Sequence, residues 1–148
     1  MGPYGLAVEN RPGRRAGLAR ELAERGEAWG DPFEITRSRR EDFEFIRPRS
    51  RADDVLSCNN DASVNTPRGH QFPMAFLTVA AGLDRHGASS RRPLRYVHLD
   101  IGGSAFEGGD WQHGRPTATP LLALSALIGM SENETGTAVR ADAAVASV

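Results

Sequence analysis

The sequence of 148 residues contains no lysine; all 18 of its basic residues other than histidine are arginine. Arginine stays protonated under physiological conditions, so this chain cannot by itself carry chemistry that needs a lysine with a shifted pKa. The single cysteine, Cys58, excludes an internal disulfide and favours a reducing cytoplasm. No stretch approaches the roughly 20 apolar residues of a membrane helix, and the first residues lack the layout of a signal peptide. These absences predict a cytoplasmic protein without a membrane partner.

The charge balance is nearly even. A formal net charge of -1 gives no reason to expect nucleic acid or anionic lipid as the main partner. Six arginines between residues 37 and 51 would suit phosphate contacts, but acidic residues interleave with them. Phosphate binding needs an excess of positive charge. We therefore interpret this segment as a solvated or subunit-facing surface and expect no nucleic-acid partner.

The first half of the chain predicts turn, helix and irregular structure. Residues 1–12 contain two glycines and two prolines and are expected to be turn-like. Residues 13–25 carry leucine and alanine at helical spacing, with Gly26 as the expected stop. Residues 29–57 are rich in charge and broken by prolines, which predicts an extended excursion that tucks its aromatic side chains under a neighbouring element. A loop follows.

The second half contains the one clear strand. Residues 72–83 have the apolar spacing of a helix, and residues 96–101 alternate between apolar and polar side chains, which is the period of a strand. Residues 121–128 are largely apolar and follow a threonine N-cap and a first-position proline, which predicts a third helix. Residues 130–148 are expected to be a frayed tail.

A lone strand has no sheet to join, and an apolar helix needs a larger body in which to bury its faces. The pattern therefore predicts an α/β fold with an incomplete sheet, as in a piece of a larger α/β domain. Ligands usually bind at the carboxyl ends of strands in such sheets. Residues 102–114, which begin with Gly102 and Gly103, are thus the first candidate for a ligand loop.

Few side chains suggest chemistry of their own. His98 and Asp100 share a strand face, which leaves a metal site or acid–base pair as one alternative and a mutually satisfied structural contact as the commoner one. The histidines show no spacing that places two ligands on one helical face. Ser104 lacks the flanking glycines of a nucleophile elbow, and the glycines around it fit neither phosphate-loop pattern, so a nucleotide site is a weak alternative. Cys58 is interpreted as a small, semi-buried side chain.

Several motifs resemble one enzyme family. Tyr96–Gly103, Tyr-Val-His-Leu-Asp-Ile-Gly-Gly, resembles the strand near the C-terminus of the leucyl (cytosol) aminopeptidases, usually an aromatic residue followed by His-Leu-Asp-Ile-Ala-Gly. His113–Pro116 resembles the Gly-Arg-Pro that opens the last helix of that family. Further anchors stand in the order of a divergent aminopeptidase branch: Glu27-Ala28-Trp29, Pro32-Phe33-Glu34, Cys58-Asn59-Asn60 and Thr66-Pro67-Arg68-Gly69-His70. The match covers roughly residues 1–129.

The resemblance implies the C-terminal portion of a mixed-sheet α/β aminopeptidase catalytic domain, which removes N-terminal residues from peptides. Family members form homohexamers and use two divalent metal ions, zinc, manganese or magnesium, with a metal-bridged water as the nucleophile. The metal ligands and catalytic lysines of the family, including an Asp-x-Glu-Gly-Arg run, do not occur in this sequence. We therefore expect no catalytic residue, no metal ligand and no bound metal in this chain, and no activity from it alone.

One functional feature of the family has matching positions in this chain: the loop after the strand. In the family, the loop after the strand helps to wall the pocket for the first side chain of the substrate. The matching positions are Gly102 and Ala105, with Ser104 between them, and Gly102 stands where the family usually has alanine. These three are the expected substrate-binding residues. The alternative function is a non-catalytic, truncated paralogue that acts as an assembly or protein-interaction module through its arginine-rich excursion.

Overall fold

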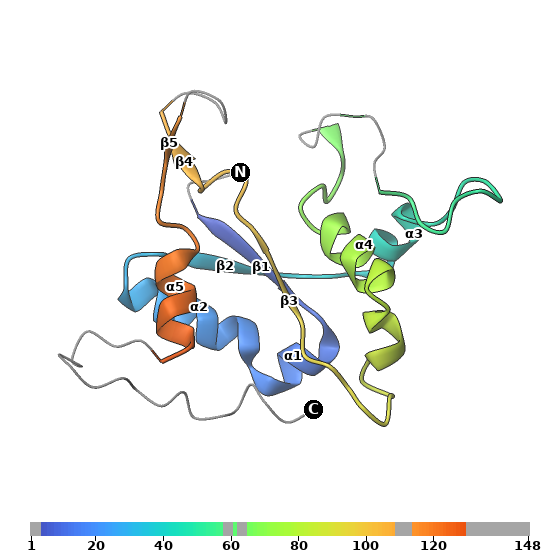
Figure 1. Cartoon of the computed structure of the whole chain (residues 1–148), viewed down its shortest axis with the longest axis horizontal. Helices are drawn as coiled ribbons and strands as arrows, with labels where there is room; N and C mark the ends of the chain where they lie inside the picture. Colours follow the sequence, from blue (N-terminus) through green and yellow to red (C-terminus); the bar gives the residue numbers. More distant parts are fainter. Residues whose placement is uncertain (1–3, 58–60, 62–64, 109–113, 130–148) are drawn as a thin grey trace. The chain divides into compact units, whose positions relative to one another are not determined.

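The computed structural model describes residues 4–57, 61, 65–108 and 114–129 (Figure 1). The chain divides into two compact units. Unit 1 comprises Met1–Gly5, Glu21–Phe33 and Ile101–Val148, and unit 2 comprises Leu6–Arg20 and Glu34–Asp100. Each unit is built from segments that are distant in the sequence, so tertiary contacts rather than chain order define it.

A three-stranded sheet in the order β2-β1-β3 organises unit 2 (Figure 1). The central strand, β1 (Gly5–Glu9), lies between β2 (Phe33–Arg37) and β3 (Val97–Asp100). β1 and β3 are antiparallel, and their register places Val8 opposite His98. Ala7 and Val8 are both fully buried. Because successive side chains of a strand point to opposite faces, β1 is covered on both faces.

Two predictions for the first half of the chain are corrected by this sheet. Residues 5–9, expected to be turn-like, form β1, and the expected irregular excursion contains β2 and the helix α3 (Arg40–Phe45). β1 carries a single β-branched residue, so distant pairing partners rather than local propensity decide this strand. The excursion does bury aromatic surface as expected, because the ring of Phe45 packs on Phe72 with 5.0 Å between centroids.

The predicted helix at residues 13–25 is two helices, α1 (Arg11–Ala16) and α2 (Leu18–Ala28). Asn10 caps α1, because its Oδ1 accepts the backbone N–H of Gly13 at 2.8 Å. Gly17, with φ of 73°, ends α1 in the left-handed region that glycine tolerates. The buried side chain of Glu9 provides a hydrogen-bond acceptor at the start of α2, because its Oε2 accepts the backbone N–H of Ala19 at 3.1 Å.

The second half of the chain follows the sequence pattern more closely. The helix α4 (Phe72–Ala80) and the strand β3 confirm the expected elements, although a 3-10 turn, η2 (Leu83–His86), replaces the last turn of the predicted helix. The final helix, α5 (Leu121–Leu127), is confirmed, but Pro120 and not Thr119 occupies its N-cap position. The expected tail, residues 130–148, lies outside the described residues.

Unit 1 contains α5, the residues of α2 from Glu21 onward, and a hairpin of β4 (Phe106–Glu107) with β5 (Arg115–Pro116). Leu22, Ala123 and Ala126 are buried in this unit. The Nη1 of Arg25 donates to the carbonyl oxygen of Ala126 at 2.7 Å, which ties α2 to the end of α5. Leu121 and Leu122 at the start of α5 and Ile128 just after its end are large apolar side chains that remain exposed.

The architecture is therefore α/β with a small sheet, which confirms the predicted class of a partial α/β domain. The expectation of a lone strand is wrong, because the described residues form five strands. Of the helices in the described part of the chain, none is long and apolar enough to cross a membrane.

Candidate functional site

The glycine-rich segment after β3 is a tight turn, as its sequence predicts. The carbonyl oxygen of Ile101 accepts the N–H groups of Ser104 at 3.0 Å and of Ala105 at 2.8 Å. Ser104 is 5% exposed, its Oγ donates to the same carbonyl at 3.3 Å, and its own carbonyl accepts the hydroxyl of Thr117 at 2.6 Å. Gly102 is exposed and Ala105 is half-buried. With its hydroxyl already engaged and buried, Ser104 has the environment of a structural residue.

The end of α2 presents a second feature of unit 1, Asp31. The backbone N–H of Asp31 donates to the carbonyl oxygen of Gly26 at 2.8 Å, and the backbone N–H of Gly30 donates to the carbonyl oxygen of Glu27 at 3.3 Å. Gly30 has φ of 75°. This is the Schellman arrangement that ends helices on a left-handed glycine. The predicted helix stop at Gly26 is therefore wrong, and Gly30 has that role.

Gly26 has a different role, inside α2. A Cβ at this position would collide with the carbonyl oxygen of Asp31 and lie 3.1 Å from the Cβ of Ala123. The missing side chain lets the turn at Asp31 and the helix α5 approach α2 closely. This approach brings the carboxylate of Asp31 to the start of α5, where Oδ2 accepts the N–H of Ala123 at 3.0 Å.

Asp31 is 3% exposed, and its other oxygen, Oδ1, is buried without a hydrogen-bond partner. The residue Asp31 is one of those that line a cavity of about 460 Å³ within unit 1. The buried Ser104 also lines this cavity, whereas Glu27 and Glu107 are exposed at it. Of the three expected substrate-binding residues, the cavity therefore includes Ser104 but neither Gly102 nor Ala105. The remaining lining residues are Tyr4, Gly30, Pro32, Gly103, Phe106, Thr117, Ala118, Thr119 and Leu122.

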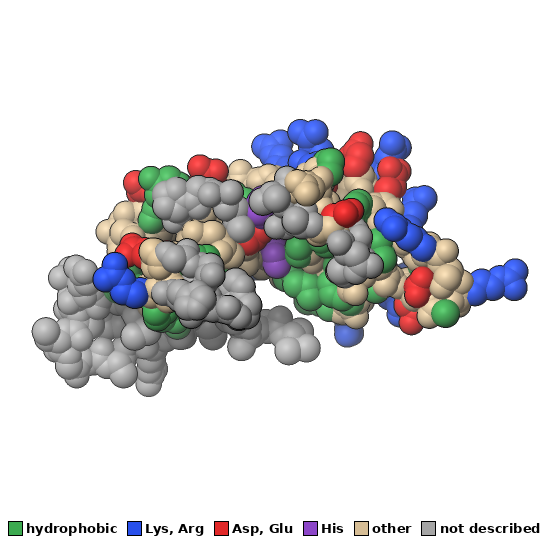
Figure 2. Space-filling model, turned by 90° about the horizontal axis from the view of Figure 1, so that it is seen from above, with side chains coloured by type: hydrophobic (Ala, Val, Ile, Leu, Met, Phe, Trp, Pro, Cys, Tyr) green, Lys and Arg blue, Asp and Glu red, His purple; other side chains and the backbone are tan. Residues whose placement is uncertain are grey.

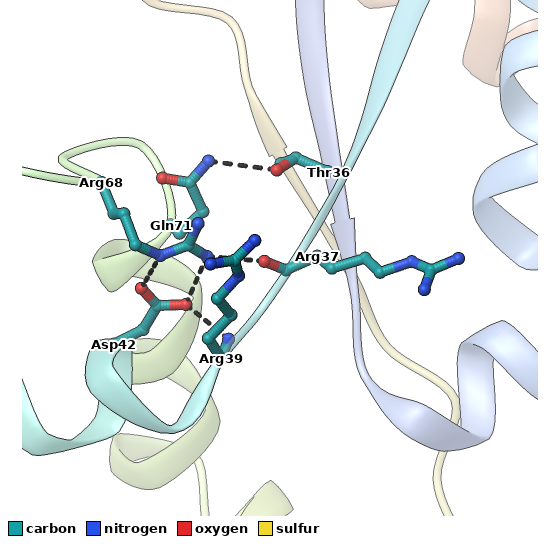
Figure 3. Close-up of polar contacts among 6 residues, drawn as sticks. All are labelled: Thr36, Arg37, Arg39, Asp42, Arg68 and Gln71. Carbon is teal, nitrogen blue, oxygen red and sulfur yellow. Dashed lines mark hydrogen bonds and ion pairs between the residues drawn. The ribbon is translucent and has the colours of Figure 1, made fainter.

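Unit 2 holds a bidentate ion pair between Arg68 and Asp42 (Figure 3). The Nε of Arg68 donates to Oδ1 of Asp42 at 2.6 Å and its Nη2 donates to Oδ2 at 2.9 Å. The same oxygen, Oδ2, accepts the N–H of Arg39 at 2.7 Å, and Nη2 of Arg68 also reaches the carbonyl of Arg37 at 2.6 Å. The hydrogen bond to Asp42 raises the pKa of Arg68. This network joins the loop before α4 to α3, so Arg68 has a structural role.

A histidine and a carboxylate also meet in unit 2. Nδ1 of His70 lies 2.8 Å from Oδ2 of Asp100. The sequence suggested His98 as the companion of Asp100, and the structure places His70 in direct contact with Asp100, while His98 interacts electrostatically with Asp100. Burial lowers the pKa of His98, and the charge of Asp100 opposes this shift. Burial also raises the pKa of Tyr96.

These groups do not make a metal centre. Throughout the described residues, no three His, Cys, Asp or Glu side chains converge as a ligand set. The donors in this part of the chain thus do not fit the two divalent ions that the family resemblance implies. Cys58 and His113, two residues of the sequence motifs, lie outside the described residues.

No family model matches the sequence, and no solved structure matches it. The sequence is, however, 37% identical over 123 residues to a protein of Caenorhabditis elegans named "Putative aminopeptidase W07G4.4". The chain is therefore similar in sequence to a protein that is named as an aminopeptidase. The aligned region covers 83% of this chain and 24% of the worm protein, so the chain spans about a quarter of the length of the curated relative that it matches. An enzyme so named is a hydrolase, which agrees with the aminopeptidase resemblance of the motifs.

The sequence did not single out Asp31 as a functional residue. It lies between two of the motif segments, Glu27-Ala28-Trp29 and Pro32-Phe33-Glu34. The available signal was the Gly-Asp-Pro run, which is typical of a turn and places a carboxylate just after a helix. Burial of that carboxylate depends on Ala123, 92 residues away.

Proposed function

We propose that this chain forms a C-terminal part of the catalytic domain of a metal-dependent aminopeptidase of the leucyl (cytosol) type, which acts on peptides in the cytoplasm. The observation that carries the proposal is the similarity to the worm protein, which extends over 83% of the chain. The order of the motifs and the turn that ends β3 support it. In the complete enzyme, Gly102, Ser104 and Ala105 would wall the pocket for the first substrate side chain.

The same proposal assigns no turnover to this chain alone. Two divalent metal ions, manganese, zinc or magnesium, would activate a water molecule in the complete enzyme. The described residues include no ligand set for them. In this proposal the chain supplies a wall of the substrate pocket, and the reacting groups belong to the rest of the complete subunit. A homohexamer of complete subunits, as in the family, is part of the proposal.

An aminopeptidase assay tests the second part. The purified chain, incubated with a leucine anilide and manganese, is expected to release no product above the rate without protein. Product release that depends on the chain and on manganese would contradict the proposed inactivity. The genomic sequence upstream of the codon for Met1 tests the first part: an in-frame Asp-x-Glu-Gly-Arg run supports the aminopeptidase proposal, and its absence contradicts it.

The alternative that we propose is an assembly or interaction module, and the exposed arginines of unit 2 support it. Fourteen of the 15 arginines of unit 2 are exposed, with Arg68 half-buried. Figure 2 shows basic side chains standing out from the surface, with acidic ones among them. Co-purification of this chain with a longer homologue, without any gain in peptidase activity, would favour this alternative.

A further inference from the structure

Unit 2 contains another cavity, of about 310 Å³, at the place where α1, α3, α4 and η2 meet. Its accessible surface is mostly apolar. Phe43 and Leu83 line it and are only half-buried, so they offer apolar surface that the chain does not cover. Cavities that bind small ligands begin at about 300 Å³ and combine apolar walls with a few polar groups. Size and lining therefore suit a small ligand with an apolar body.

The polar groups of this lining fall into two classes. The side-chain amide of Asn10 and the hydroxyl of Thr78 bond to backbone groups of the chain itself. Arg11, Arg14 and Asp84 are exposed and take part in none of the ion pairs formed among the described residues. These three charges are thus available to a ligand, and two of them are positive.

The two arginines belong to one helix. Arg11 and Arg14 lie three positions apart on α1, a spacing that places both on the same side of a helix. An arginine can pack its aliphatic stem against apolar surface while its guanidinium stays in water. The guanidinium is a permanent positive charge with forked donors that match a carboxylate. Two such groups beside an apolar cavity are complementary to a ligand with an apolar body and one negative end.

Other ligand chemistries use less of this cavity. A cation would meet two positive charges against the single carboxylate of Asp84, and the described residues include no convergent set of metal ligands. An inorganic anion would leave the apolar wall in contact with water. A small organic carboxylate uses both the charge and the apolar surface.

We propose that this cavity binds a small monocarboxylate with an aliphatic or aromatic body, with the body on Phe43 and Leu83 and the carboxylate at Arg11 and Arg14. Free apolar amino acids have this carboxylate and body, and so have simple aliphatic and aromatic acids. The site does not depend on the proposed aminopeptidase function, because binding requires neither metal nor turnover.

An NMR titration of the full chain tests the site with four probes. Hexanoate carries both features, hexanamide removes the charge, acetate removes the apolar body, and leucine adds an ammonium group. Hexanoate is expected to bind at millimolar concentration, and hexanamide and acetate about fivefold or more weakly, because each keeps only one of the two contributions. Leucine that binds as tightly as hexanoate supports a free amino acid as the source, and weaker leucine binding supports an acid without an ammonium group. Failure of hexanoate to bind, or equal binding of hexanamide or acetate, would overturn the proposal.

The resonances that shift locate the ligand. The methyl groups of Met74, Thr78 and Leu83 belong to lining residues and are expected to shift with hexanoate. The methyl groups of Ala123 and Ala126, in α5 of unit 1, are the reference and should not shift. Shifts that spare all three lining residues would contradict the assigned cavity.

Charge variants are expected to have effects of opposite sign. Arg11→Gln and Arg14→Gln each remove one positive charge and should weaken hexanoate about twofold to fivefold, with no change for hexanamide. Asp84→Asn removes a like charge and should strengthen hexanoate by up to about twofold. Arg15→Gln removes an exposed charge of α1 that does not line this cavity, and is the matched control. Equal weakening by Arg15→Gln would indicate general attraction to unit 2 and contradict the site.

These charge variants all change exposed side chains, and circular dichroism checks their folding before titration. Leu83→Ala removes apolar surface and should weaken hexanoate and hexanamide by the same factor, about twofold to threefold. If Leu83→Ala does not fold, the charge variants still decide the question. Unchanged hexanoate affinity in folded Arg11→Gln and Arg14→Gln refutes the carboxylate site.

Discussion

The buried carboxylates of the two units differ in how many hydrogen-bond donors they have. In unit 2, the carboxylate of Asp42 accepts two hydrogen bonds from Arg68 and one from the backbone N–H of Arg39. The carboxylate of Glu9 accepts the backbone N–H of Ala19 at the start of α2. In unit 1, Oδ2 of Asp31 has one backbone donor, and its Oδ1 is buried without a hydrogen-bond partner. A carboxylate that is satisfied by its own chain is a structural element. One that is left half satisfied is expected to lower the stability of the folded state.

The units also differ in charge. Among the described residues, unit 2 carries 15 arginines against 10 acidic residues, a net charge of +5, and unit 1 carries 2 arginines against 5 acidic residues, a net charge of -3. The overall charge of -1 conceals this division. An even balance in the whole sequence therefore does not exclude charged surfaces in its parts.

The largest expected effect tests whether the units are separate. Leu22 is fully buried in unit 1, so Leu22→Ala is expected to lower the free energy of unfolding by about 3 kcal/mol through lost contacts and a cavity. Hydrogen exchange should show the loss of protection in α5 and not in β1 or β3. Leu121→Ala, on a side chain that is 66% exposed, is the matched control with little effect. Equal loss of protection in both units would show that they unfold as one.

The next test removes the ion pair of unit 2. Arg68→Ala leaves the carboxylate of Asp42 buried with only the N–H of Arg39, and is expected to cost about 2–3 kcal/mol, because the side chain of Asp42 is 1% exposed. Arg68→Lys keeps the charge but loses the forked geometry, so it should cost less. Urea denaturation measures both. Equal losses in the two variants would show that the positive charge contributes nothing without the bidentate geometry.

A smaller effect is expected at the close approach in unit 1. Gly26→Ala adds a Cβ that collides with the carbonyl of Asp31, and is expected to cost about 1–2 kcal/mol despite the better helix propensity of alanine. Glu24→Ala, at an exposed position of the same helix, controls for propensity. Fluorescence of the half-buried Trp29 during urea denaturation is a suitable probe. A gain in stability for Gly26→Ala would show that α2 and the turn at Asp31 can separate freely.

The smallest effect is a pH dependence in unit 2. Burial lowers the pKa of His98, so the folded state binds fewer protons at this site than the unfolded state between the lowered pKa and about 6.5. Stability should therefore fall as the pH falls through this window, with the charge of Asp100 reducing the effect. His98→Gln should flatten the slope. His86→Gln keeps His98 and should keep the slope, and a flat profile in the unchanged chain would contradict the expectation.

Local pattern was sufficient for some elements. Alternation predicts β3, helical spacing predicts α4 and α5, and two glycines predict the turn at residues 102–104. These features depend on side chains within a few positions of one another. The same pattern could not separate α1 from α2, because Gly17 and Gly26 both lie in one helical run and only backbone conformation distinguishes a helix end from a close contact.

By itself, the sequence determined the absence of lysine chemistry and of an internal disulfide, the strand and turn at residues 97–104, and the resemblance to an aminopeptidase. Only the tertiary structure decided that residues 5–9 are a central strand, that Asp42 meets Arg68, and that Asp31 is buried under α5. Each of these depends on groups brought together from 26 to 92 positions apart, or on pairing with distant strands. Burial and satisfaction of a charge depend on all the groups that surround it, and no local pattern contains them.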